Sequence, residues 1–165
     1  LRLCAGLVPV VEGDARVLGV DLGKNRRGVR RRVGMVGHDS GLYSDLTVSE
    51  NMAFFARAAG VEPPHSADAL DRLQVARRLS ELPVRALSTG QRKRVSFAAM
   101  LVRRPELWLL DEPHSGLDEG GRDLIDGLIS EAAAAGATVL FASHELDRAN
   151  QVAHRSVTIT GGMTP

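Results

Sequence analysis

The sequence is poor in cysteine and aromatic residues, carries little net charge, and has no long apolar run. Its single cysteine, Cys4, excludes an internal disulfide framework; near Leu3 and Leu7 it is interpreted as a small core residue. No apolar stretch approaches the roughly 20 residues that cross a bilayer, so we expect any membrane role to come through a partner. The formal net charge of +1 gives no reason to expect a polyanion as main partner.

One basic run departs from this even charge distribution. It comprises Arg26, Arg27, Arg30, Arg31 and Arg32. Because few aromatic residues accompany it, a solvated hairpin face is favoured over a nucleic-acid surface. We therefore predict that the protein has no nucleic-acid partner.

The chain has 165 residues, of which 44% are hydrophobic and 25% are charged, and this composition predicts one globular domain with a real core. It begins with Leu1 rather than Met, and the spacing of the apolar residues in 1–7 is typical of the tail of a helix. We expect an N-terminal truncation from this pattern.

Alternating patterns and short apolar runs predict five strands and five helices. The runs 107–110 and 138–142 are continuously apolar, which is typical of central parallel strands covered on both faces. The order of elements in the C-terminal half predicts a parallel α/β sheet with right-handed crossovers. The strands are expected at 15–22, 33–37, 107–110, 138–142 and 156–160, and the helices at 47–59, 67–79, 88–103, 119–135 and 145–152.

Two carboxylates, Asp111 and Glu112, directly follow the apolar run 107–110. The carboxyl end of a strand is where α/β sheets place their ligands, and neighbouring side chains there point in different directions. Asp111 is placed to hold hydrated Mg²⁺, and Glu112 is placed to act as general base on a water. The alternative is a solvated turn after a strand.

A second candidate site is the segment Leu87-Ser88-Thr89-Gly90-Gln91, which opens a predicted helix. Ser88 is a good N-cap, and Gly90 lets backbone approach a ligand closely. The free N–H groups and positive dipole of a helix N-terminus suit an anion such as a terminal phosphate. The alternative is an ordinary capped helix start.

Two further segments follow the apolar strands. His144 comes after the run 138–142, beside the same edge of the predicted sheet, where it could donate to a phosphate oxygen or be merely structural. Ser115-Gly116-Leu117-Asp118 is a tight loop after the run 107–110.

The order and spacing of these segments resemble the ABC ATPase family. Residues 87–91 resemble its signature motif, 107–112 its Walker B strand with the catalytic glutamate, and 115–118 its D-loop. His144 resembles the switch histidine, and 46–51 the start of the helical subdomain. The resemblance covers essentially the whole chain.

This resemblance implies a P-loop NTPase-like ABC ATPase fold of the α/β class. It implies a mostly parallel sheet with an antiparallel β edge, and a helical subdomain. We expect one domain over 1–165, with an α/β core formed by 1–37 and 104–165 and a helical subdomain over about 38–103. The strands and the phosphate loop that begin the family's domain are expected to be missing.

The resemblance also implies ATP and Mg²⁺ as cofactors, and head-to-tail pairing with a second ABC ATPase domain. Residues Ser88, Thr89, Gly90 and Gln91 would contact the ATP held by the partner domain. The remaining roles are Mg²⁺ binding for Asp111, polarisation of the attacking water for Glu112, γ-phosphate binding for His144, and bridging of the two sites for Asp118.

Two departures from the family pattern stand out. The expected G-x-x-x-x-G-K-[ST] loop is absent; the segment 19–25 is one residue too short and lacks Ser or Thr after Lys24. We therefore expect residues 1–165 alone to have lost much of their phosphate binding and to be inactive as an ATPase. In addition, His38 stands where the family has the glutamine of its Q-loop, which puts coupling to the membrane subunit in doubt.

The run 37–47 resembles the ATP-binding subunits of haem exporters for cytochrome c maturation. The resemblance thus predicts a subunit that drives export through transmembrane permease subunits, at the cytoplasmic face of the cell membrane. A multidrug-type exporter subunit is the alternative. A ribosome- or DNA-associated ABC ATPase is disfavoured by the short spacing from His38 to Ser88 and by the single domain.

Overall fold

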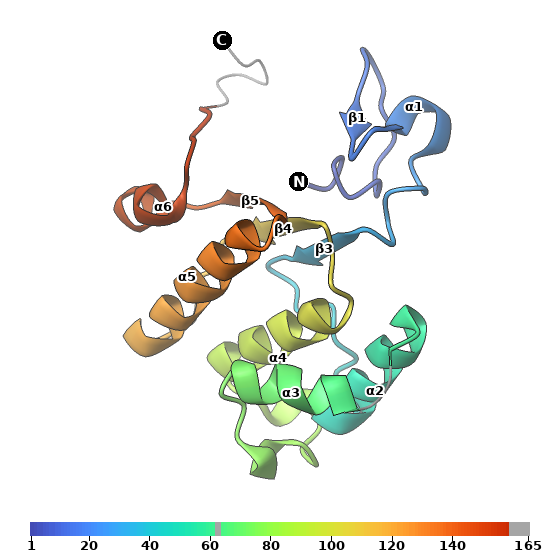
Figure 1. The fold of residues 1–165 in the computed structure, drawn as a ribbon. Helices are drawn as coiled ribbons and strands as arrows, with labels where there is room; N and C mark the ends of the chain where they lie inside the picture. Colours follow the sequence, from blue (N-terminus) through green and yellow to red (C-terminus); the bar gives the residue numbers. More distant parts are fainter. Residues whose placement is uncertain (62–63, 159–165) are drawn as a thin grey trace.

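Three apolar runs of the sequence form one parallel sheet in the computed structural model, which describes residues 1–61 and 64–158. The strands are β3 (Val33–Val36), β4 (Leu107–Asp111) and β5 (Thr138–Ala142), in the order β3–β4–β5 (Figure 1). The register pairs Val36 with Leu110 and Asp111 with Ala142. The three carboxyl ends therefore lie along one edge of the sheet.

One outer strand, β5, is covered less than the central strand β4. Residues 107–110 of β4 are buried throughout, as predicted. In β5 the exposed and half-buried residues alternate, and Leu140 is 44% exposed. The prediction of a buried strand was therefore right in range but wrong for one face. The reason is that, among the described residues, β5 pairs only with β4, and α5 packs against it.

Four predicted helices are confirmed, with each end within one residue of its predicted position. They are α2 (Val48–Ala59), α4 (Thr89–Val102), α5 (Glu119–Ala134) and α6 (Leu146–Val152). The spacing of Thr47 and Glu50 predicts a capping box, and the two residues form one at the start of α2. Gly136 has φ of 92°, a left-handed conformation that glycine adopts without steric cost, just after α5 ends.

The expected single strand over 15–22 is a hairpin instead. β1 (Arg16–Val17) pairs antiparallel with β2 (Val20–Asp21), as a small sheet separate from the parallel one. Leu18 and Gly19 turn the chain with φ of 50° and 79°. The alternation of apolar residues continues across this turn, which is why it resembled one strand. The Asp21 carboxylate then caps the short helix α1 (Leu22–Asn25).

The helix predicted over 67–79 is shorter than expected. It is α3 (Pro64–Arg72), and the 3₁₀ turns η1 (Arg77–Leu79) and η2 (Val84–Ala86) follow it. Gln74 has φ of 54°, so the chain leaves the helix there. Leu73 and Leu79 nevertheless remain buried, which maintained the helical pattern in the sequence.

Three other expectations concern the ends and one break. Residues 1–7 form successive turns rather than a regular helix, with an Ala5 N–H to Leu1 carbonyl bond of 3.1 Å. Residues 156–158 are in no strand, and the rest of the strand expected at 156–160 lies outside the described residues. Pro63-Pro64 is expected to break the helix over 47–59; Pro63 lies outside the described residues, Pro64 begins α3, and α2 has already ended at Ala59.

The apolar core is divided by β4. Leu107 and Leu109 pack with the N-terminal residues, including Leu22, Val29 and Val33. Leu110 faces the opposite side, where the core is formed by α2, α4 and α5. In Figure 1 the N-terminal segment accordingly lies apart from these helices. Side chains alternate along a strand, so β4 supplies both clusters.

The basic run of the sequence holds the N-terminal turns in place. The Arg26 guanidinium donates to the Leu7 carbonyl at 3.2 Å, and that of Arg30 donates to the Gly6 carbonyl at 2.9 Å. Arg32 forms a bidentate pair with Glu106 at 2.6 and 2.7 Å. These arginines thus act within the chain as well as facing solvent.

Along residues 1–61 and 64–158, no helix combines the length and the apolar character needed to traverse a lipid bilayer.

Candidate functional site

The carboxylates after β4 lie at the edge of the sheet, as predicted. Asp111 is the last residue of the strand, and Glu112 follows it with φ of 48°, in the left-handed region that non-glycine residues rarely occupy. The Glu112 N–H donates to the Ala142 carbonyl at 2.9 Å, which ties this turn to the end of β5. Backbone strain of this kind gathers at functional sites.

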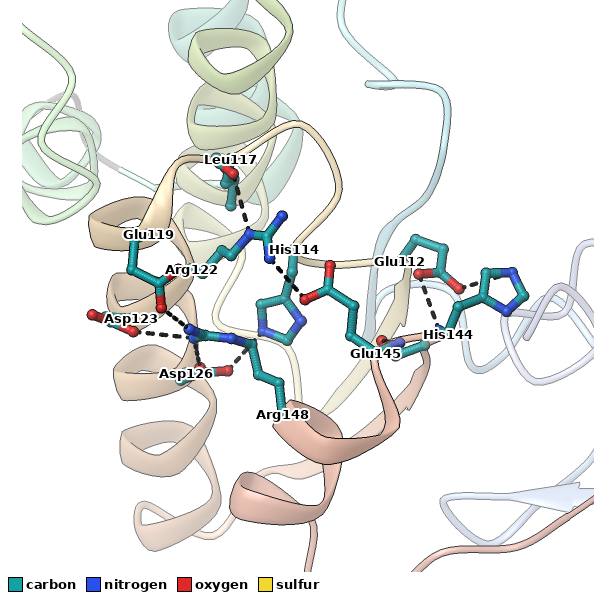
Figure 2. Close-up of polar contacts among 11 residues, drawn as sticks. Glu112, His114, Leu117, Glu119, Arg122, Asp123, Asp126, His144, Glu145 and Arg148 are labelled. Atoms are coloured by element: carbon teal, nitrogen blue, oxygen red, sulfur yellow. Dashed lines mark hydrogen bonds and ion pairs between the residues drawn. The ribbon is translucent and has the colours of Figure 1, made fainter.

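Glu112 and His144 meet across the two strand ends (Figure 2). The His144 N–H donates to Glu112 Oε2 at 3.3 Å, and His144 Nε2 lies 3.4 Å from Glu112 Oε1. The imidazole is 95% exposed, whereas the Glu112 side chain is 31% exposed. The pair therefore presents an acid–base group and an exposed donor to the same patch of solvent.

A buried lysine binds the backbone of this turn, and this role was not predicted from the sequence. Lys93 is 8% exposed, and its Nζ donates to the Glu112 carbonyl at 3.1 Å and to the Gly37 carbonyl at 3.4 Å. Burial lowers the pKa of Lys93, and the charges of Asp111 and Glu112 partly oppose that shift. Lys93 and Phe97 are four positions apart and so lie on the same face of α4. A lysine on the face that carries the buried Phe97 was the signal in the sequence.

The start of α4 is closed by reciprocal hydrogen bonds. The Gln91 N–H donates to Ser88 Oγ at 3.2 Å, and the Ser88 N–H donates to Gln91 Oε1 at 2.9 Å. Ser88 is thus the N-cap that the sequence predicted. The reciprocal pair leaves the N–H groups of Thr89 and Gly90 without a cap in α4, so a ligand could accept from them.

Gly90 is also required by a contact inside the chain. A Cβ atom at Gly90 would lie 2.9 Å from the Gly116 carbonyl oxygen, and one at Gly116 would lie 2.8 Å from Thr89 Cγ2. The first turn of α4 therefore packs directly against the loop before α5. The sequence argument, which gave Gly90 only a ligand-facing reason, missed this approach.

Asp118 completes this second cluster. Its carboxylate accepts from the Gly121 N–H at 3.0 Å, which caps α5, and lies 3.3 Å from Arg94 Nη2. The surrounding groove has a volume of about 570 Å³. Five predicted residues line it together: Ser88, Thr89, Gly90, Gln91 and Asp118. The basic side chains of Arg78 and Arg94 also line it, so the groove suits an anionic ligand.

The structure thus sorts the predicted residues into two sets. Asp111, Glu112 and His144 lie at the strand ends, whereas the residues of the groove lie around the start of α4. His38, two residues after β3, is exposed and belongs to the same sheet edge as the first set. A hollow of about 640 Å³ between α2 and α3 contains none of them.

The donor set at the sheet edge fits a largely hydrated Mg²⁺. Across residues 1–61 and 64–158, no group of three or more His, Cys, Asp or Glu side chains could hold a metal ion. Asp111 would therefore supply a single carboxylate. Mg²⁺ keeps several waters and is commonly bound through one or two carboxylates together with substrate phosphates.

Sequence comparisons add known relatives to this geometry. A model of the family described as "ABC transporter" matches residues 1–115. The cytochrome c biogenesis ATP-binding export protein CcmA of Nitrosomonas europaea is 37% identical over 147 residues, 88% of this chain and 68% of that protein. The Nod factor export ATP-binding protein I of Sinorhizobium fredii is 34% identical over 164 residues, 98% of this chain and 48% of that protein.

Solved structures show the same fold. A dimeric bacterial ABC transporter cassette superposes with a TM-score of 0.81 at 21% identity, covering 90% of this chain and 70% of that one. A post-hydrolysis dimer of an ATP-binding cassette, bound to ADP and Pi, superposes with a TM-score of 0.78 at 23% identity, covering 90% and 69%.

Proposed function

The chain belongs to the ABC transporter family as an ABC-type ATPase subunit, and we propose that it drives haem export for cytochrome c maturation through membrane permease subunits. The observation that carries the ATPase part is the contact between Glu112 and His144 at the sheet edge. The haem part is supported by the run 37–47 and by CcmA relatives at 33–38% identity.

The two sets of residues suit two different ATP molecules. In the proposed head-to-tail dimer, the first set acts on one ATP, and the groove residues reach the ATP held by the partner domain. Ser88 and the N–H groups at the start of α4 would face its γ-phosphate, and Asp118 would connect the two sites. Two solved structures of similar fold are described as dimeric, which supports the pairing of two such domains.

The chemistry is phosphoryl transfer to water, in which positioning and charge neutralisation do most of the work. Glu112 would accept the proton of the attacking water, and the exposed imidazole of His144 would donate to the γ-phosphate. Mg²⁺, held by Asp111, would neutralise phosphate charge. His38 would act where its family has a glutamine, and its influence on coupling to the permease is part of the proposal.

A second candidate is export of another substrate. It is favoured by the Nod factor export relative, which matches 98% of this chain. The substrate is recognised by the membrane subunits, so the ATPase roles are the same under both candidates. Under either, the subunit would lie at the cytoplasmic face of the membrane through its permease partners.

Glu112→Gln in the complete transporter tests the ATPase role. Removal of the general base is expected to lower ATP turnover by about 100-fold or more, while MgATP binding changes little, because binding uses other groups. Turnover is measured by phosphate release and binding by fluorescence titration. The matched control is Glu81→Gln at an exposed position, which is expected to leave both unchanged. Unaltered turnover in Glu112→Gln would contradict the assignment.

Cells that carry the same two variants test the substrate. Under haem export, Glu112→Gln abolishes covalent haem in c-type cytochromes, as detected by haem staining, and Glu81→Gln does not. Normal c-type cytochromes, with turnover lost in vitro, would retain the ATPase role and favour the other exporter.

A further inference from the structure

A buried histidine lies between the two sets of candidate residues. His114 is in the loop that joins Glu112 to Asp118, and it is 1% exposed. Its Nε2 lies 2.7 Å from Asp126 Oδ1 on α5, and the Asp126 side chain is 16% exposed. Figure 2 shows this ring pointing away from the sheet edge and toward α5.

The acceptor of this contact is itself held by an arginine. The guanidinium of Arg148, from α6, contacts Asp126 and pairs with Asp123 at 3.1 Å and with Glu119 at 2.6 Å. Carboxylate oxygens accept hydrogen bonds, and Asp126 accepts from Arg148 on its other oxygen. The contact between His114 Nε2 and Asp126 Oδ1 therefore suits a hydrogen bond donated by the imidazole.

The second ring nitrogen of His114, Nδ1, makes a histidine at this position energetically unfavourable. In the described part of the chain, His114 Nδ1 has no hydrogen-bond partner, although it is buried. An unmatched buried nitrogen costs free energy that an apolar side chain of the same size would avoid. Within residues 1–61 and 64–158, the contact from Nε2 to Asp126 is thus the polar contact that the His114 ring makes.

Arg122 makes a second connection between this loop, α5 and the segment after β5 (Figure 2). Arg122 of α5 donates from Nε to the Leu117 carbonyl at 3.2 Å, and from Nη1 to Glu145 Oε2 at 3.0 Å. Leu117 immediately precedes Asp118, and Glu145 immediately follows His144. The guanidinium of Arg122 thus binds both the residue before Asp118 and the residue after His144.

We propose that His114 and Arg122 are positioning residues that hold Glu112 and His144 in register. His114 joins the loop after Glu112 to α5, and Arg148 joins α5 to α6; Arg122 joins the same loop to the residue after His144. The two strand-end loops are thereby connected through α5. This inference rests on the proposed roles of Glu112 and His144.

The test compares His114→Met with His114→Gln in the complete transporter. Met keeps the apolar volume but cannot donate to Asp126, whereas the Gln amide can replace Nε2–H. We expect His114→Met to lower kcat by about tenfold with KM for MgATP changed less than about twofold, because a small misplacement of catalytic groups acts on the chemical step. His114→Gln is expected to retain kcat within about threefold of wild type.

Arg122→Gln provides a second variant at a partly exposed site, in case His114→Met does not fold, as judged by circular dichroism. It is expected to lower kcat in the same way and to leave KM nearly unchanged. Wild-type kcat in Arg122→Gln or in folded His114→Met, while Glu112→Gln is inactive, would overturn this inference alone. Full activity of Glu112→Gln would instead overturn the proposed function.

Discussion

Glu112 is the residue at which backbone strain and candidate chemistry coincide. A glutamate with φ of 48° is unfavourable on its own, and three contacts hold it there. Its N–H is bound by Ala142, its carbonyl by Lys93, and its carboxylate by His144. A strained conformation persists only where such surroundings over-determine it. The direction of the carboxylate is therefore set by tertiary contacts.

Lys93→Met should change how stability depends on pH. Burial lowers the pKa of Lys93 in the folded chain, whereas the pKa of a lysine in the unfolded chain is about 10.4. Between these two values the unfolded chain binds more protons, so the free energy of unfolding rises with pH. Lys93→Met removes this contribution, and the wild type should gain stability relative to it as the pH rises into the alkaline range.

Urea unfolding of both chains at pH 7 and in steps to pH 10 measures this difference. Lys24→Met serves as control, because the Lys24 side chain is 87% exposed. Its unfolding free energy should follow the wild type at every pH. Parallel curves for Lys93→Met and wild type would show that the lowered pKa of Lys93 has no part in stability.

At the scale of elements, the helices that frame the candidate site start with side-chain caps. α2 and α4 each have a complete capping box, from Thr47 with Glu50 and from Ser88 with Gln91. Hydrogen bonds from the Thr47 backbone and hydroxyl lower the pKa of Glu50. A capping box satisfies two donors that the helix itself leaves free, so these starts are locally encoded.

Thr47→Ala tests the cap of α2 away from the candidate site. Loss of the side-chain acceptor should lower the free energy of unfolding by about 1 kcal/mol and Tm by roughly 2–4 °C. Thr47→Ser keeps the acceptor and should stay close to wild type. Thermal unfolding followed by circular dichroism measures both, and equal Tm values for Thr47→Ala and wild type would contradict the prediction.

At the scale of the whole molecule, the parallel sheet brings distant loops to one edge and leaves the outer face of β5 partly exposed. Neither the sheet edge nor the groove contains a Gly-rich phosphate loop, since the sequence 1–165 has no G-x-x-x-x-G-K-[ST] segment. Phosphate binding in such proteins rests heavily on the backbone N–H groups and the lysine of that loop.

We therefore expect residues 1–165 on their own to bind MgATP more weakly than micromolar. Calorimetric titration of the purified chain measures the affinity, with MgCl₂ alone as the control titration. Micromolar binding of MgATP would show that the groove or the sheet edge holds the nucleotide without that loop.

Much of the fold could be predicted because its signals are local. The apolar run of β4, the caps of α2 and α4, and the polar residues after β4 and β5 were all found from short stretches of sequence. The hairpin at 15–22 was missed because apolar alternation continues through Leu18 and Gly19. The end of α3 was missed because buried Leu73 and Leu79 keep a helical spacing after the chain has left the helix.

The sequence by itself determined the family, the order of the three parallel strands and of the helices from α2 to α6, and the residue types at both candidate sites, because each motif is a short segment with its own local preferences. Only the tertiary structure decided which of them meet. Glu112 contacts His144, which lies 32 positions away in the sequence, and Lys93 reaches the Glu112 carbonyl from α4. His114, in the loop after β4, contacts Asp126 on α5. Such contacts depend on strand register and helix packing, which no single segment encodes.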